Sequence, residues 1–182
     1  MTTFLLHGGL TSKQCSNNRD FYVEMASRVK KNGIWLGCYF ASDETRKKKK
    51  FLSDKRKILR SVKHKIECIF AEPQKFEQQL AKADMIYFAG GTTLKLMDEL
   101  KRYKNLKNLL QQCNVVAGSS AGMNILGKEW LGKSSQGKGL GLLPMSMVVH
   151  YGAPEYANQH KNITLPAPIL KLRETQFVVI EQ

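Results

Sequence analysis

The middle of the chain reads Asn114-Val115-Val116-Ala117-Gly118-Ser119-Ser120-Ala121-Gly122-Met123-Asn124. Residues 114–117, which are largely apolar, predict a buried strand, and the residues after Gly122 suit a helix. Between them, the sequence matches G-x-S-x-G, a pattern in which a serine stands on a sharp turn from strand to helix. The helix N-terminus behind such a turn offers free N–H groups to a developing oxyanion. Ser120 is therefore a candidate nucleophile; the alternative is an ordinary Gly/Ser turn that caps a helix.

Strands and helices alternate along the chain before this turn. Apolar runs predict strands at 4–6, 34–40, 65–70 and 85–88. Helical spacing of apolar residues predicts helices at 18–31, 48–63, 73–83, 93–101 and 106–112. Beyond Gly127 we predict a loop at 133–141, a strand at 145–150, an irregular segment at 153–166 and a last strand at 176–180. The alternation is typical of a three-layer α/β fold, a parallel sheet with helices on both faces.

The composition restricts the class of protein. A chain of 182 residues that is 42% hydrophobic suits one domain, 1–182, with a packed core. No apolar run reaches the roughly 18–20 residues that cross a bilayer, and the first residues lack the basic segment of a signal peptide. Four cysteines without a C-x-x-C pair argue against a disulfide scaffold or a zinc site. We therefore expect a cytoplasmic protein with reduced thiols and no membrane partner.

The chain is strongly basic, with 29 Lys+Arg against 15 Asp+Glu and a net charge of +14. Much of the excess lies in 46–65, where Asp54 is the only acidic residue. No series of aromatic residues for base stacking accompanies these cations. We interpret the segment as a solvated helix face, with nucleic-acid binding as the alternative.

A serine nucleophile needs a base, and histidine is the commonest choice. The four histidines are His7, His64, His150 and His160. We favour His150, because it ends the apolar run 147–149 and lies downstream of the serine, as in several triads; His160 is the second choice. An orienting acid after Ser120 must be a glutamate, and the choices are Glu129, Glu155, Glu174 and Glu181. An upstream aspartate, or no acid, also remains open.

A second glycine turn, Gly90-Gly91-Thr92-Thr93, follows the strand predicted at 85–88. In a parallel sheet it can lie beside the Ser120 turn, and its N–H groups, with that of Ala121, would form an oxyanion hole. The alternatives are an ordinary strand-to-helix turn and a phosphate-binding loop. A third glycine pair, in His7-Gly8-Gly9, is similar to the oxyanion motif of lipases, but the chain is too short for their α/β-hydrolase fold.

Taken together, three motifs resemble the peptidase E (aspartyl dipeptidase) and cyanophycinase family of serine peptidases. They are Ala89-Gly90-Gly91-Thr92-Thr93, Gly118-Ser119-Ser120-Ala121-Gly122, and Leu142-Leu143-Pro144 leading to Val148-Val149-His150. The resemblance runs from Leu5-Leu6-His7-Gly8-Gly9 to the last strand. Two places differ: the family usually has Gly-Gly-Gly-Asn-Thr at the glycine turn, and it often carries an aspartate where 133–136 has none.

The resemblance implies a class I glutamine-amidotransferase-like (flavodoxin-like) fold and a serine-type peptidase. It implies Ser120 as nucleophile, His150 as base and Glu174 as acid, with Gly91 and Ala121 supplying oxyanion N–H groups. The implied substrates are short peptides, Asp-X dipeptides among them, and no metal or organic cofactor is expected. The alternatives are a non-catalytic amidotransferase-like binding module and a nucleic-acid-binding protein that uses 46–65. The oligomeric state stays open, with a homodimer as one option.

Overall fold

The computed structural model describes residues 1–133, 135–161 and 163–182. Within them, the larger of two sheets has the strand order β10-β1-β5-β4-β2-β3. Its strands are β1 (Thr3–His7), β2 (Ile34–Cys38), β3 (Glu67–Phe70), β4 (Met85–Phe88), β5 (Val115–Ser119) and β10 (Phe177–Glu181). The first five run parallel and β10 pairs antiparallel with β1, so the carboxyl ends of β1, β4 and β5 meet at one edge.

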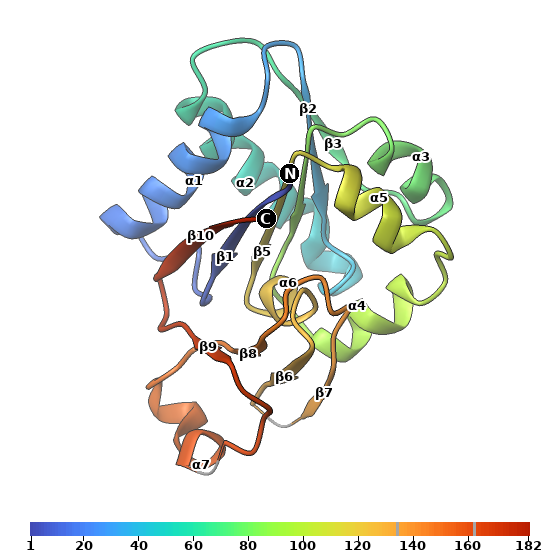
Figure 1. Ribbon diagram of the computed structural model, residues 1–182. Coiled ribbons are helices and arrows are strands. Elements are labelled where there is room, and N and C mark those ends of the chain that lie inside the picture. Colours follow the sequence, from blue (N-terminus) through green and yellow to red (C-terminus); the bar gives the residue numbers. More distant parts are fainter. Residues whose placement is uncertain (134, 162) are drawn as a thin grey trace.

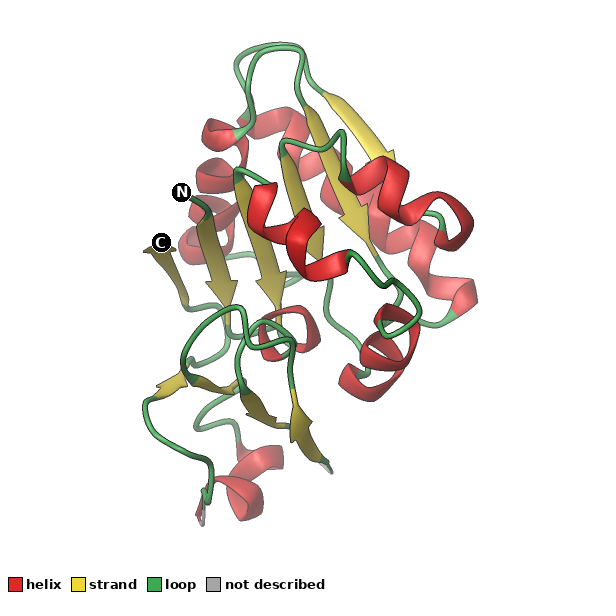
Figure 2. Ribbon diagram, turned by 45° about the vertical axis from the view of Figure 1, so that its right-hand side comes forward, coloured by secondary structure: helices red, strands yellow, loops and turns green. Residues whose placement is uncertain are grey.

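Helices cover both faces of this sheet (Figures 1 and 2). On one face lie α1 (Ser16–Arg28) and α2 (Glu44–Ser61), whose buried residues Phe21, Met25 and Ile58 pack with strand residues such as Trp35. The other face carries η1 (Pro73–Lys75), α3 (Phe76–Leu80), α4 (Thr93–Leu100), α5 (Leu106–Gln112) and α6 (Ala121–Asn124). The predicted three-layer α/β fold is confirmed.

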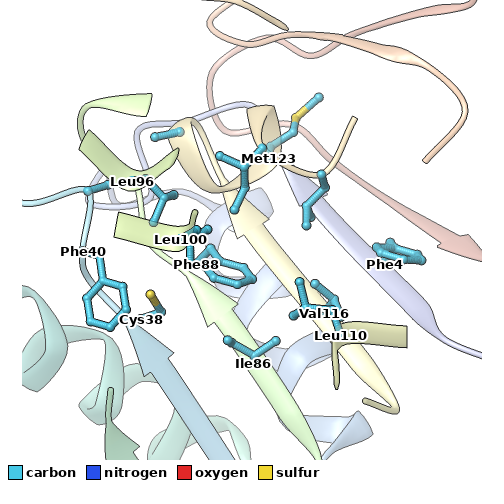
Figure 3. Close-up of a cluster of buried hydrophobic side chains, with 14 of the residues drawn as sticks. Phe4, Cys38, Phe40, Ile86, Phe88, Leu96, Leu100, Leu110, Val116 and Met123 are labelled. Atoms are coloured by element: carbon cyan, nitrogen blue, oxygen red, sulfur yellow. The ribbon is translucent and has the colours of Figure 1, made fainter. Parts of the chain in front are cut away.

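The second face shows why the central strands are apolar throughout. Figure 3 shows Ile86 and Phe88 of β4 beside Val116 of β5, with Leu96 and Leu100 of α4 packed over them. Strands that are covered on both faces bury side chains of either direction, which removes the usual alternation of apolar and polar residues. The sheet is therefore a rigid base for the turns at its carboxyl edge.

A smaller sheet lies beyond that edge (Figure 1). Its strand order is β7-β6-β8-β9, with β6 (Glu129–Leu131), β7 (Gln136–Lys138), β8 (Ser146–Val148) and β9 (Ile169–Lys171). Two short helices, η2 (Pro154–Tyr156) and α7 (Ala157–Lys161), connect β8 to β9. The segments after β8 and β9 therefore return to the carboxyl edge of the larger sheet.

Three sequence predictions for this region are wrong. Residues 133–141 contain β7 rather than only a loop, and 153–166 contain η2 and α7 rather than an irregular segment. Two residues of these stretches, Ser134 and Asn162, lie outside the described residues. Ser134 also belongs to 133–136, the segment in which the family often carries an aspartate. The predicted strand 145–150 ends at Val148, so His150 lies beyond it. Strands of three residues carry too few positions to show a periodicity, which also explains why β6 and β9 were not predicted.

No helix in the described part of the chain combines the length and apolar character needed to span a bilayer.

Candidate active site

Ser120 stands alone between β5 and α6, with φ 49° and ψ −111°. A non-glycine residue at positive φ is strained and persists only where its surroundings enforce it. The glycines on both sides of Ser120 allow the close backbone packing that enforces this conformation. A Cβ at Gly118 would lie 2.4 Å from the carbonyl oxygen of Gly122, and one at Gly122 would lie 1.9 Å from that of Phe88. The Ser120 N–H also donates to the carbonyl oxygen of His7 at 3.0 Å. The backbone thus fixes the serine at the edge of the sheet.

His150 reaches the serine from the smaller sheet. It follows β8 with φ 52°, and its N–H donates to the carbonyl oxygen of Gly8 at 2.9 Å. Its ring lies against Gly9, where a Cβ would stand 2.3 Å from Cε1 of the ring. Nε2 of His150 is 2.9 Å from Oγ of Ser120. This distance allows direct proton transfer between the two side chains.

Glu174 lies on the turn between β9 and β10, on the other side of the imidazole. Its Oε1 is 2.8 Å from Nδ1 of His150. The turn is anchored to the β1 loop, because the Thr175 N–H donates to the Gly9 carbonyl oxygen at 3.0 Å. An ionised carboxylate only accepts, so Nδ1 carries the proton and Nε2 is free to accept the serine hydroxyl.

The other candidates from the sequence lie elsewhere. Nε2 of His64 is 2.9 Å from the carbonyl oxygen of Val29, the residue that follows the C-terminal end of α1. His160 lies on α7 and stacks on Tyr156 rather than contacting Ser120. Among the described carboxylates, Glu174 alone comes within hydrogen-bond distance of the His150 ring.

His7 is fully buried beneath the site. Its Nδ1 accepts from the Gly9 N–H at 3.0 Å, which leaves Nε2 to donate to Oδ1 of Asn18 at 2.8 Å. Burial lowers the pKa of His7 to about 4, with the charges of His150 and Lys57 adding to the effect and the Asn18 hydrogen bond opposing it. Neutral His7 therefore holds the loop that follows β1.

The glycine turn after β4 lies directly beside the serine. A Cβ at Gly90 would be 3.3 Å from Cβ of Ser120, and one at Gly91 would be 2.2 Å from the carbonyl oxygen of Ala41. Within the described residues, the N–H groups of Gly90, Gly91 and Ala121 have no acceptor. Free N–H groups that converge beside a serine can bind an oxyanion.

A cavity of about 310 Å³ opens above Ser120 and His150. Besides the turns, it is lined by one side of α2, namely Lys50, Ser53, Asp54 and Lys57. The sequence interpretation of this helix as a solvated face missed these residues. Lys50, Asp54 and Lys57 are spaced i, i+4 and i+7 and so share one side of the helix, but this spacing alone does not show whether that side faces solvent or a site.

Asp54 organises this side of the cavity. It is 7% exposed, and its carboxylate accepts from the hydroxyls of Tyr22 at 2.6 Å and Tyr39 at 2.8 Å. Lys57 Nζ is 3.5 Å from the same carboxylate and donates to the carbonyl oxygen of Thr11 at 3.0 Å. Lys50 Nζ donates to Oγ of Ser42 at 3.0 Å and to the carbonyl oxygen of Gly90 at 3.1 Å. Both lysine ammonium groups are thus held by hydrogen bonds, and both lysines line the same cavity as Ser120.

Known structures share this fold. A peptidase from an acI-B1 Actinobacterium superposes with a TM-score of 0.73 at 17% identity, covering 98% of this chain and 83% of that one. A protein from Listeria monocytogenes EGD-e classed as a peptidase E gives a TM-score of 0.68 at 17% identity, covering 100% of this chain and 99% of that one. No curated protein sequence matches significantly.

The family assignment comes from the sequence profile of peptidase family S51, which matches residues 16–182. The match includes the serine turn, the glycine turn after β4 and the segments that carry His150 and Glu174. It agrees with the resemblance to peptidase E in the motifs. The chain belongs to peptidase family S51 and is a serine-type peptidase.

Proposed function

We propose that the protein hydrolyses short peptides through a Ser120-His150-Glu174 triad. The observation that carries the proposal is the continuous chain of hydrogen bonds, 2.9 Å from Ser120 Oγ to His150 Nε2 and 2.8 Å from His150 Nδ1 to Glu174 Oε1. Such a chain aligns a nucleophile, a base and the group that orients the base.

The geometry supports a two-step hydrolysis. Ser120 Oγ attacks the scissile carbonyl carbon while its proton passes to Nε2 of His150. The oxyanion is stabilised by N–H groups of Gly90, Gly91 and Ala121. His150 then protonates the departing amine, leaving an acyl-Ser120 ester that water, deprotonated by His150, hydrolyses to the free acid. Glu174 stays ionised and stabilises the imidazolium in both steps.

The cavity favours a substrate with an acidic residue, of which Asp-X dipeptides are the simplest. Lys50 Nζ lies beside Gly90 and bonds only to neutral oxygens. Within the described residues, no carboxylate oxygen lies within 4 Å of it. A fixed ammonium without a carboxylate partner attracts a substrate carboxylate more strongly than one already neutralised.

Labelling with a fluorophosphonate probe tests the triad. The wild type is expected to label, and Ser120→Ala and His150→Ala are expected to remain unlabelled. Ser119→Ala is the matched control, because the neighbouring Ser119 hydroxyl is buried and bonds to the Tyr87 hydroxyl at 3.0 Å. Labelling of a folded Ser120→Ala protein would refute the assignment.

A dipeptide screen tests the substrate. We expect kcat/KM for Asp-Leu to exceed that for Asn-Leu, which has nearly the same shape without the charge. Lys50→Met should reduce this preference by about tenfold, the effect of losing one favourable charge contact. Lys49→Met is the control, because Lys49 is exposed and outside the cavity lining. Equal rates on the two dipeptides would exclude an acidic preference.

A further inference from the structure

A second cavity, larger than the catalytic one, lies between α1 and α2. Its volume is about 590 Å³, within the range of small-ligand sites. The two helices run side by side on one face of the larger sheet (Figure 1). We call this cavity the α1–α2 groove. It takes no part in the proposed chemistry at Ser120.

The α1–α2 groove is lined by cations from both helices, from the loop before α1 and from the segment after α2. They are Lys13, Arg19, Lys57, Arg60 and Lys63, and the described lining residues include no acid. Arg19 has Asp20 at 3.4 Å and Lys57 has Asp54 at 3.5 Å. In the described part of the chain, no carboxylate oxygen lies within 4 Å of the charged groups of the other three. Several like charges around one concavity create a positive potential that an anionic ligand would neutralise.

The groove also adjoins the catalytic cavity. Thr11, Ser12 and Lys57 line both of them. Lys57 Nζ donates to the carbonyl oxygen of Thr11 at 3.0 Å, so a chain bound at Ser120 would reach the groove by passing over this pair. The groove in addition exposes Val23, a residue that is 44% exposed, beside the aliphatic stems of its lysines and arginines. Such a lining accepts the methylene groups of a peptide as well as its charges.

We propose that the α1–α2 groove binds an acidic peptide segment that continues from the residues cleaved at Ser120. The proposal rests on the proposed function and extends its substrate class from dipeptides to longer acidic peptides. A peptide fits better than a nucleic acid, because the aromatic ring in the lining, Tyr22, is 2% exposed and offers no face for base stacking.

Direct binding tests the proposal independently of catalysis. Two fluorescein-labelled peptides are titrated with Ser120→Ala protein at low salt, with anisotropy as the readout. In Asp-Leu-Glu-Glu-Glu the glutamates follow Asp-Leu, and in Glu-Glu-Glu-Asp-Leu they precede it. We expect at least one of them to bind about tenfold more tightly than the matching peptide with glutamine in place of glutamate. Arg60→Glu/Lys63→Glu should abolish the difference. Lys104→Glu/Lys107→Glu, an equal charge change on exposed residues outside the groove, should preserve it.

Turnover distinguishes failure of this proposal from failure of the proposed function. Asp-Leu hydrolysis should be the same in the wild type and both double variants, while the acidic extension lowers KM only where Arg60 and Lys63 are intact. Failure of the wild type to hydrolyse Asp-Leu would count against the proposed function alone, since peptide binding is measured independently of turnover. Equal binding of the glutamate and glutamine peptides would overturn the groove proposal. The proposal would also be overturned if a thymidine oligonucleotide bound through Arg60 and Lys63 and the acidic peptide did not displace it.

Discussion

The imidazole of His150 stacks in parallel on the phenol ring of Tyr156, with ring centroids 4.9 Å apart and ring planes at 5° to each other. Tyr156 stacks in turn on His160, with centroids 5.6 Å apart. Parallel, offset rings are a favourable aromatic arrangement, and a cation over a tyrosine face is in addition attracted by the ring quadrupole. In the proposed mechanism this ring of Tyr156 lies against the imidazolium that forms at His150 in each step.

Replacing the ring should slow catalysis without weakening substrate binding. We expect Tyr156→Ala to lower kcat by about three- to tenfold, which corresponds to a cation–π contribution of about 0.5–1 kcal/mol together with a less restrained imidazole. KM should change little. Tyr156→Phe keeps the ring and should retain most of the wild-type kcat. If the phenylalanine variant is as slow as the alanine variant, the hydroxyl rather than the stack is responsible.

Glu174 and the other glutamates can be separated by isosteric substitution. Glu174→Gln removes the negative charge that keeps the proton of His150 on Nδ1. The tautomer with an unprotonated Nε2, which is needed to accept the serine proton, is then no longer enforced. Loss of the equivalent charge in a Ser-His-Asp protease costs about 10⁴ in kcat, and we expect a loss of about 10²–10⁴ here. Glu129→Gln and Glu155→Gln should remain near wild type in dipeptide turnover. A comparable loss in Glu155→Gln would move the acid to η2.

The neutral state of His7 predicts how stability depends on pH. The unfolded chain binds a proton at His7 near pH 6.5, whereas the folded protein binds it only near pH 4. Above pH 6.5 both states are neutral there and the residue adds no pH dependence. Between these values only the unfolded state is protonated, so the free energy of unfolding falls by about 3 kcal/mol as the pH is lowered.

His7→Asn isolates this contribution, because the remaining histidines and carboxylates are common to both proteins. Urea unfolding between pH 7 and pH 4.5 should show a shallower pH dependence in the variant, by up to one proton. The variant should also be less stable at pH 7, since it loses the hydrogen bond to Asn18 and the contact with Phe21. Parallel stability curves would show that His7 does not resist protonation.

The sequence was informative where single residues obey strong local rules. The G-x-S-x-G pattern and the continuous apolar strands predicted the Ser120 turn and the larger sheet, because a tight backbone approach and burial on two faces each demand a narrow set of residues. The smaller sheet has strands of three residues and was largely missed. The lining of the cavity by Lys50 and Lys57 was also missed, because a lysine in a basic helix has the same appearance in sequence whether it faces solvent or a site. Only the crossing of α2 over the carboxyl edge distinguishes them.

Gly9 offers a test of the position of His150 that leaves every polar group in place. Its φ is 120°, and an added Cβ would lie 2.3 Å from Cε1 of the His150 ring. Gly9→Ala must therefore displace the imidazole from Ser120, and we expect kcat to fall by about a hundredfold or more, since a shift of about 1 Å in a catalytic group costs this much. Gly141→Ala is the control for backbone strain: its φ is 65° and no atom lies within 4 Å of the added Cβ. It should cost about 1–2 kcal/mol of stability and leave kcat unchanged. Normal fluorophosphonate labelling of Gly9→Ala would mean that the reactive serine does not depend on His150.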